Sequence, residues 1–188
     1  ITDTAENVII GKGSFAAANA DEDSNVVIGY LAGASIDAST SDDNIIIGSN
    51  AGTGGGEVMK ECIVIGSYAM NSSAANAQTG TIAIGHTALT ALTVGAGNVA
   101  LGYLALSTLI AGGNNTAIGH ESMVDCNNAG ADNNTCVGFR SGYDMSGYAS
   151  HSNTFIGAYA GGGTWVTAAS IKSTAIGYGA MGGACNTA

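Results

Sequence analysis

One short phrase recurs ten times along this 188-residue chain: an aliphatic residue, Gly, two variable residues and then Ala or Ser. Successive copies are 17 to 20 residues apart. Such a fixed period is typical of a solenoid, in which one supersecondary unit stacks on itself. The aliphatic–glycine pairs are Ile10-Gly11, Ile28-Gly29, Ile47-Gly48, Ile65-Gly66, Ile84-Gly85, Leu101-Gly102, Ile118-Gly119, Val137-Gly138, Ile156-Gly157 and Ile176-Gly177.

The residues before each repeat glycine predict a short β-strand. Counted back from that glycine, position −3 is always β-branched and position −2 is apolar. Runs of this kind, opened by Asn and closed by Gly, are strand signals. Position −4 is Asn in seven repeats, and stacked Asn side chains can form hydrogen-bonded ladders, so we interpret them as structural. They are Asn7, Asn25, Asn44, Asn98, Asn115, Asn134 and Asn153.

The fold class is therefore predicted to be all-β, a single β-solenoid of about ten 17–20-residue coils over residues 1–188. A second, weaker strand is expected in the variable half of each coil. A hexapeptide-repeat helix, and with it an acyltransferase, is excluded because Thr90 and Ala96 follow Ile84 at intervals of six, where that helix needs aliphatic residues.

The two faces of the predicted strand lead to an expectation about stoichiometry. Positions −3 and −1 share one face and −2 points to the other, and both faces are apolar. A strand that is apolar on both sides is expected to be buried on both sides. The far half of each coil is mostly Ala, Gly, Ser, Asn and Thr, too polar to close a monomeric coil. Other copies of the chain, packed around an axis, are the simplest way to cover the second face.

Composition limits the partners. Charged residues are 10% of the chain and sum to −10, which disfavours nucleic acid and anionic membrane surfaces as partners. The uncharged stretch 94–113 is long enough to span a bilayer, but the repeat continues through it at Gly102, so we predict coil and no membrane insertion. Cys62, Cys126, Cys136 and Cys185 form no CxxC motif; Cys136 is predicted to be a small buried residue, and Cys126 and Cys185 could pair between chains.

The sequence contains no catalytic motif, and we predict neither an enzyme nor a cofactor. Acidic loops offer weak candidate Ca²⁺ ligands, Asp21, Asp23, Asp42 and Asp43, and solvated loop charge is the preferred interpretation. His86 and His120 follow repeat glycines with Tyr103 between them. At about 10 Å apart they cannot share a metal within one chain, whereas three symmetry copies of one His could meet on an axis.

Aromatic residues are the best candidates for binding. Tyr30, Tyr103 and Tyr178 directly follow repeat glycines and are predicted to wall a groove between subunits. The spacer region 139–166 holds the densest aromatic cluster, which suits stacking on sugar rings or anchoring a protein contact. We therefore place the predicted receptor-binding site on Phe139, Tyr143, Tyr148, Tyr159 and Trp165.

The segments Asn115-Thr116-Ala117-Ile118-Gly119, Asn153-Thr154-Phe155-Ile156-Gly157 and Ser173-Thr174-Ala175-Ile176-Gly177 resemble the Asn-Thr-Ala-Ile-Gly repeats of trimeric bacterial adhesin heads and of chaperone-terminated phage tail fibres. The resemblance covers the whole chain. It implies a homotrimeric, left-handed parallel β-roll that presents binding loops to a polysaccharide or protein receptor on a host cell surface, on a virion tail or in another extracellular setting.

The long, uneven spacers favour the phage fibre over the adhesin head, whose repeats are shorter. Asn186-Thr187-Ala188 is predicted to begin an eleventh repeat of a longer fibre. A third possibility is an ice-binding solenoid, because Thr116, Thr135, Thr154 and Thr174 form a column. Against it, these Thr share a face with the repeat aliphatic and are expected to point inward.

Overall fold

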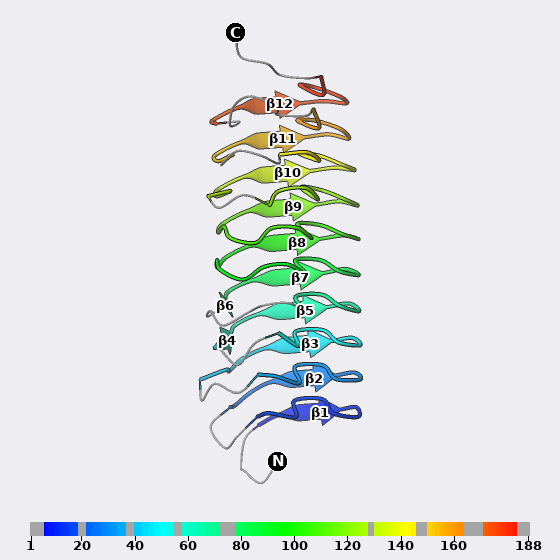
Figure 1. The fold of residues 1–188 in the computed structure, drawn as a ribbon, viewed down its shortest axis with the longest axis vertical. Coiled ribbons are helices and arrows are strands. Elements are labelled where there is room, and N and C mark those ends of the chain that lie inside the picture. The colour runs from blue at the N-terminus through cyan, green and yellow to red at the C-terminus, as the bar shows by residue number, and fades with distance from the viewer. Residues whose placement is uncertain are drawn as a thin grey trace.

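The computed structural model describes residues 6–18, 22–36, 40–54, 58–71, 78–127, 130–145, 150–163 and 171–183. Ten three-residue strands stack into one parallel sheet that runs the length of a rod (Figure 1). Each strand ends immediately before a repeat glycine. The strands are β1 Val8–Ile10, β2 Val26–Ile28, β3 Ile45–Ile47, β5 Ile63–Ile65, β7 Ile82–Ile84, β8 Val99–Leu101, β9 Thr116–Ile118, β10 Thr135–Val137, β11 Thr154–Ile156 and β12 Thr174–Ile176.

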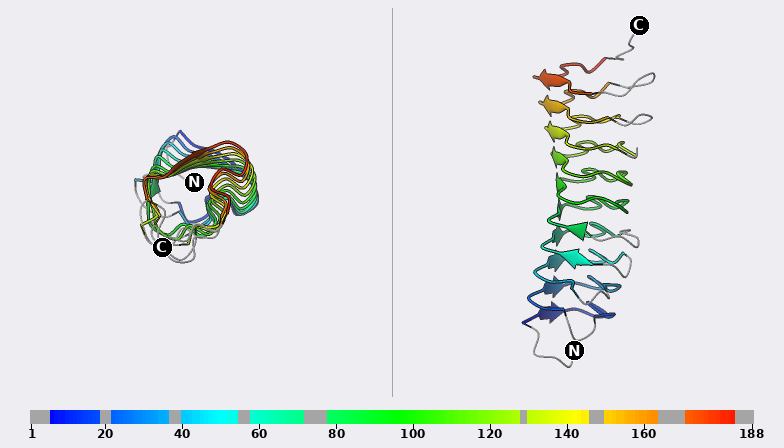
Figure 2. Two further views of the ribbon diagram at one scale, coloured as in Figure 1. Left: turned by 90° about the horizontal axis from the view of Figure 1, so that it is seen from above. Right: turned by 90° about the vertical axis from the view of Figure 1, so that its left-hand side faces the viewer.

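The chain is a parallel β-solenoid with about 19 residues per coil, as the repeat predicts. Equivalent positions pair in register, from Val8 with Val26 to Thr154 with Thr174. Seen along the rod, the coils superimpose around a common interior (Figure 2). No part of the described chain forms a helix that could span a bilayer, and the uncharged stretch 94–113 contributes coil and strand β8.

The weaker second strand is confirmed in part. Strands β4 (Met59–Lys60) and β6 (Gln78–Thr79) pair in parallel on a second side of the solenoid. Elsewhere in the described residues the spacers pair through isolated bridges: Val94 with Ala111, Asp125 with Asp144 and His151 with Ile171. Pairing there is short because the spacers differ in length and sequence from coil to coil.

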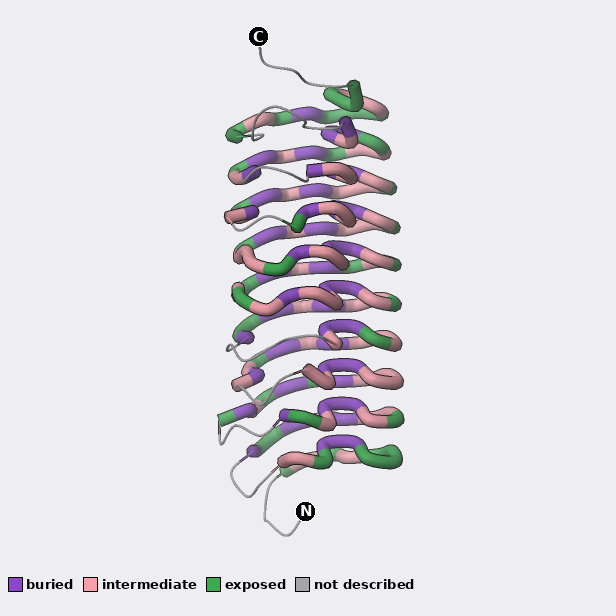
Figure 3. Tube along the Cα trace, viewed as in Figure 1, coloured by how far each residue is buried: buried purple, intermediate pink, exposed green. Residues whose placement is uncertain are grey.

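A single chain closes its own core, which corrects the expectation that the coils are too polar to do so. The −2 residues point inward, and those of β2 to β12 are buried, from Val27 at 0% exposure to Ala175 at 4%. The missing apolar surface comes from residues four and seven places after the repeat glycine. Leu89, Leu92 and Leu106, all fully buried, are examples. Buried stretches recur at equivalent places in successive coils (Figure 3). Leucines and methionines scattered through the spacers thus align once the coils stack.

Within a coil, the sizes of the inward residues at −2 and +4 compensate one another. A small −2 residue has a long +4 partner, as in Ala83 with Leu89, Ala100 with Leu106 and Ala117 with Met123. A larger −2 residue often has glycine at +4, as in Val27 with Gly33, Ile46 with Gly52 and Phe155 with Gly161. A Cβ on Gly161 would lie 2.5 Å from Cε2 of Phe155. The coils of Ile9 with Phe15 and of Val64 with Met70 depart from this pattern.

The repeat glycine is required by the backbone itself. Gly119 has φ +140°, a conformation that L side chains rarely adopt. A Cβ there would also lie 2.7 Å from the carbonyl carbon of Gly138 in the next coil. The small residue at +3 is Ala or Ser in every repeat. It faces its own core, as when buried Ser141 donates through Oγ to the carbonyl of Phe155, 2.9 Å away.

The Asn column forms the expected ladder. Buried Asn134 donates through Nδ2 to Oδ1 of Asn115 and to the carbonyl of Ser150, at 3.0 and 2.8 Å. Its own Oδ1 accepts from the backbone and side-chain amides of Asn153, at 3.1 and 2.9 Å. Cys62 and Thr81 interrupt the ladder between Asn44 and Asn98. These Asn residues hold coils together, which confirms their structural interpretation.

Candidate binding surface

The outward face of the ten-stranded sheet is a continuous apolar strip. It consists of the −3 and −1 residues of every strand, and none of them is buried in the single chain. Ile10 and Ile176 are the most exposed of the aliphatics, at 58% and 69%. The face comprises Val8, Ile10, Val26, Ile28, Ile45, Ile47, Ile63, Ile65, Ile82, Ile84, Val99, Leu101, Thr116, Ile118, Thr135, Val137, Thr154, Ile156, Thr174 and Ile176.

The threonine column belongs to this outward face. Thr116, Thr135, Thr154 and Thr174 are half-buried or exposed. The expectation that they point inward is therefore wrong. The reason is that position −2, not −3 and −1, supplies the core, so everything that shares a face with the repeat aliphatic points away from the coil.

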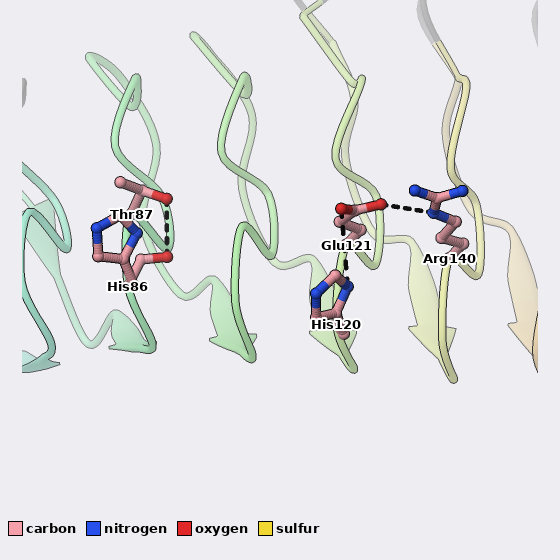
Figure 4. A network of polar contacts seen from close by, with 5 residues as sticks. All are labelled: His86, Thr87, His120, Glu121 and Arg140. Carbon is pink, nitrogen blue, oxygen red and sulfur yellow. Dashed lines mark hydrogen bonds and ion pairs between the residues drawn. The ribbon is translucent and has the colours of Figure 1, made fainter.

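Beside this strip, at the turns that follow the strands, seven rings form an aromatic ladder along the rod. Its members are Tyr68, His86, Tyr103, His120, Phe139, Tyr159 and Tyr178. Neighbouring centroids are between 4.9 Å, for Tyr103 and His120, and 6.3 Å, for Tyr68 and His86. His86 and His120 are on either side of Tyr103, as the repeat phase predicts. Thr87 and Glu121 occupy the position after each His (Figure 4).

Ring orientation in the ladder depends on the position within the turn. His86, Tyr103, His120 and Phe139 all directly follow the repeat glycine, and their successive planes differ by 16°, 27° and 36°. Tyr159 is one residue later, after small Ala158, and its plane makes 83° with Phe139 and 78° with Tyr178. Stacked rings cover one another's faces, whereas the rotated Tyr159 ring does not lie flat against either neighbour.

Arg140, the single arginine of the chain, lies among these rings. Its Nε donates to Oε2 of Glu121 in the preceding coil, 2.5 Å away (Figure 4). This hydrogen bond raises the pKa of Arg140. The guanidinium carbon is 5.3 Å from the centroid of Phe139 and 4.9 Å from that of Tyr143. Arg140, Glu121, Phe139, Tyr143 and Tyr159 are called the Arg140 cluster below.

The structure brings together three of the five predicted receptor-binding residues. Phe139 and Tyr159 are neighbours in the ladder, and Tyr143 packs on Arg140. Tyr148 and Trp165 lie outside the described residues. Tyr103 and Tyr178, predicted to wall a subunit groove, are exposed ladder members, and Tyr30 is exposed near the first coils. The sequence analysis did not select Arg140 as a candidate site residue. It is the single arginine of the chain, and this could have drawn attention to it.

The acidic loops are partly engaged with the backbone. Oδ1 of Asp42 accepts from the amide of Asp23 at 3.0 Å, and Oδ1 of Asp132 accepts from Gly113 at 2.7 Å. Asp21 lies outside the described residues. Within the described ranges, no three His, Cys, Asp or Glu side chains are grouped to hold a metal ion. The backbones of Asp125 and Asp144 form a β-bridge between neighbouring coils. The pKa of Asp125 is raised, mainly by burial and in addition by the charge of Asp144.

Three cysteines are fully buried as free thiols: Cys62, Cys126 and Cys136. Burial raises the pKa of Cys126 to about 12, and it also raises the pKa values of Cys62 and Cys136. The expectation for Cys136 is confirmed. Cys126 is fully buried in the single chain, so an interchain disulfide would require this thiol to become exposed; Cys185 lies outside the described residues.

The described surface is open, because its residues form no pocket. Comparison with known proteins finds no matching family model, no similar curated protein and no similar solved structure.

Proposed function

We propose that this chain is a structural and receptor-binding segment of a homotrimeric fibre that attaches to a cell surface, of the phage tail-fibre type. The apolar outward face packs against copies of the same chain around a common axis, and the turns and spacers remain available to a host polysaccharide or protein receptor. The sequence resemblance to Asn-Thr-Ala-Ile-Gly fibres supports the same assignment.

The observation that carries the proposal is the uniform outward face. Sixteen of its twenty residues are Val, Ile or Leu, although none of them is buried in its own chain. Exposed apolar patches much larger than a few hundred Å² are uncommon on monomers and mark interaction sites. A second copy has the same coil spacing, so its contacts repeat in phase along the whole rod. A partner with another period would lose that match after a few coils.

The test is the mass of the particle in solution, measured by sedimentation equilibrium. The wild type is expected to be a trimer, and Ile65→Asp, at the middle of the outward face, is expected to be monomeric because three carboxylates would be buried near one another. Ile110→Asp is the matched control, since Ile110 is exposed on the spacer side. A wild type that stays monomeric at high micromolar concentration would overturn the proposal.

One observation favours a second function, ice binding. The threonine column of β9–β12 faces outward beside Ile118, Val137, Ile156 and Ile176, on a regular parallel sheet. Such a face repeats at about 4.8 Å along the rod. It would have to be free of other copies, so the two functions compete for one surface.

Thermal hysteresis separates them. A monomer that lowers the freezing point of water below its melting point, and loses the effect in Thr135→Tyr, would establish ice binding. A trimer without thermal hysteresis would exclude it.

A further inference from the structure

We propose that the Arg140 cluster binds a carboxylated saccharide, a sugar of the uronic or sialic acid class. This inference rests on the proposed attachment function and specifies its ligand. The carboxylate would pair with the terminal nitrogens of Arg140, and the pyranose ring would lie against the rotated ring of Tyr159.

The first step of the argument is the state of the guanidinium. Glu121 takes only the Nε hydrogen, and within the described chain the two terminal nitrogens donate to no acceptor. Phe139 and Tyr143 hold the guanidinium carbon at 5.3 and 4.9 Å from their centroids. An arginine fixed in this way presents the pair of N–H groups that binds a carboxylate with two parallel hydrogen bonds.

The second step is the ring beside it. Tyr159 occupies the same turn position as Arg140 in the next coil, and its amide donates to the carbonyl of Phe139 at 2.9 Å. Its plane stands at 83° to that of Phe139, so the two rings are not stacked face to face, and Tyr159 is 37% exposed. The apolar face of a sugar ring packs on such an aromatic face, while its hydroxyls stay in water.

The third step is the shape of the surface, which favours a saccharide over an acidic peptide. The described residues form no pocket around the cluster. The side chains that dominate protein and peptide contacts usually fill pockets at the interface, whereas a sugar ring can pack on an open aromatic side chain. The net charge of −10 on the chain repels an anionic ligand at long range. The attraction therefore has to come from the guanidinium of Arg140 at short range.

The experiment is calorimetric titration of the full chain with hexagalacturonate, a hyaluronan hexasaccharide and sialyllactose, with cellohexaose and lactose as neutral probes. At least one acidic probe is expected to bind, at least tenfold more tightly than the neutral ones. Arg140→Gln and Tyr159→Ala are expected to weaken it at least tenfold and fivefold. Arg140→Lys keeps the charge but lacks the planar fork, and it should also lose most of the affinity.

Lys172→Gln and Tyr30→Ala are the matched controls, because they remove a cation and an exposed tyrosine elsewhere and should leave binding unchanged. Circular dichroism of each variant checks that it is folded. If no acidic probe binds at 1 mM, or if a hexaglutamate peptide binds equally well, the inference is wrong. Sedimentation of the same samples keeps the two proposals apart: a trimer that binds no saccharide refutes this inference alone, and a monomer that binds one refutes the trimer alone.

Discussion

The two faces of the sheet obey different rules. The inward residues vary widely in size, from Ala83 to Phe155, and most coils compensate with their own +4 residue. The outward residues hardly vary, being Val, Ile, Leu or Thr in every strand. The core therefore tolerates different combinations of −2 and +4 residues in different coils. A face that repeats one size and shape along the rod is suited to a single partner with the same period.

The largest effect is expected where the backbone between the two faces is altered. Gly119→Ala places a methyl group against the backbone of Gly138 and forces φ near +140° on an L residue. We expect a loss of about 4 kcal/mol or more in the free energy of unfolding, measured by urea denaturation. Gly177→Ala separates the two causes. Gly177 has φ +121° but no described atom near the added methyl, so it should lose only about 1–3 kcal/mol.

The most direct comparison of the faces uses two adjacent residues of β11. Phe155→Ala removes a fully buried ring and is expected to cost about 3–5 kcal/mol. Ile156→Ala, on the outward face, should cost the isolated chain only about 1–2 kcal/mol because this residue is already 39% exposed. Urea denaturation is measured at a nanomolar protein concentration so that the chain is monomeric. Equal losses would contradict the distinction between the faces.

The size compensation between positions −2 and +4 can be tested by introducing the residue pair of one coil into another coil. Ala117→Phe alone should overpack against Met123 and cost about 1–3 kcal/mol. Adding Met123→Gly reproduces the Phe155 and Gly161 pair and should recover most of that loss. A double-mutant cycle measures the coupling. If the two losses simply add, each coil does not balance its own volume.

The smallest effect concerns the pH dependence contributed by Asp125. Its pKa is raised in the folded chain, so the folded state binds the proton more tightly than the unfolded state does. The contribution of Asp125 to the free energy of unfolding is therefore most favourable below the unfolded pKa of about 3.9. It falls as the pH rises through the folded pKa. Asp125→Asn should raise stability at pH 7 by less than about 1 kcal/mol and flatten this part of the profile. Asp23→Asn, at another acidic loop, is the comparison variant.

Much of this architecture could be predicted from the repeat. Position −2 was correctly separated from −3 and −1, and the Asn column and the buried Cys136 were correctly assigned. Closure of the core could not be predicted, because Leu89, Leu106 and Gly161 share a position while differing completely in size. Their common role becomes visible only when each is paired with the −2 residue of its coil.

The candidate site was only partly predictable for a similar reason. The ladder combines residues at two turn positions, and the shift of Tyr159 from one to the other rotates its ring. Non-glycine residues at this second position, such as Tyr68, Arg140 and Tyr159, all adopt left-handed backbone, with φ values of 58°, 52° and 58°. Residue type does not reveal this geometry, because Leu, Asn, Thr and Glu occupy the same position in other coils.

Each strand of the ten-stranded sheet pairs only with strands of the coils before and after it, which has a consequence for how such a rod can change over generations. Unequal recombination between two copies of the repeat would remove or add whole coils and rejoin equivalent positions. Each event would change the length of the rod by about 4.8 Å, and every remaining coil would keep neighbours of the same kind. Rod length can thus drift in unit steps, independently of whatever the non-repeating residues recognise.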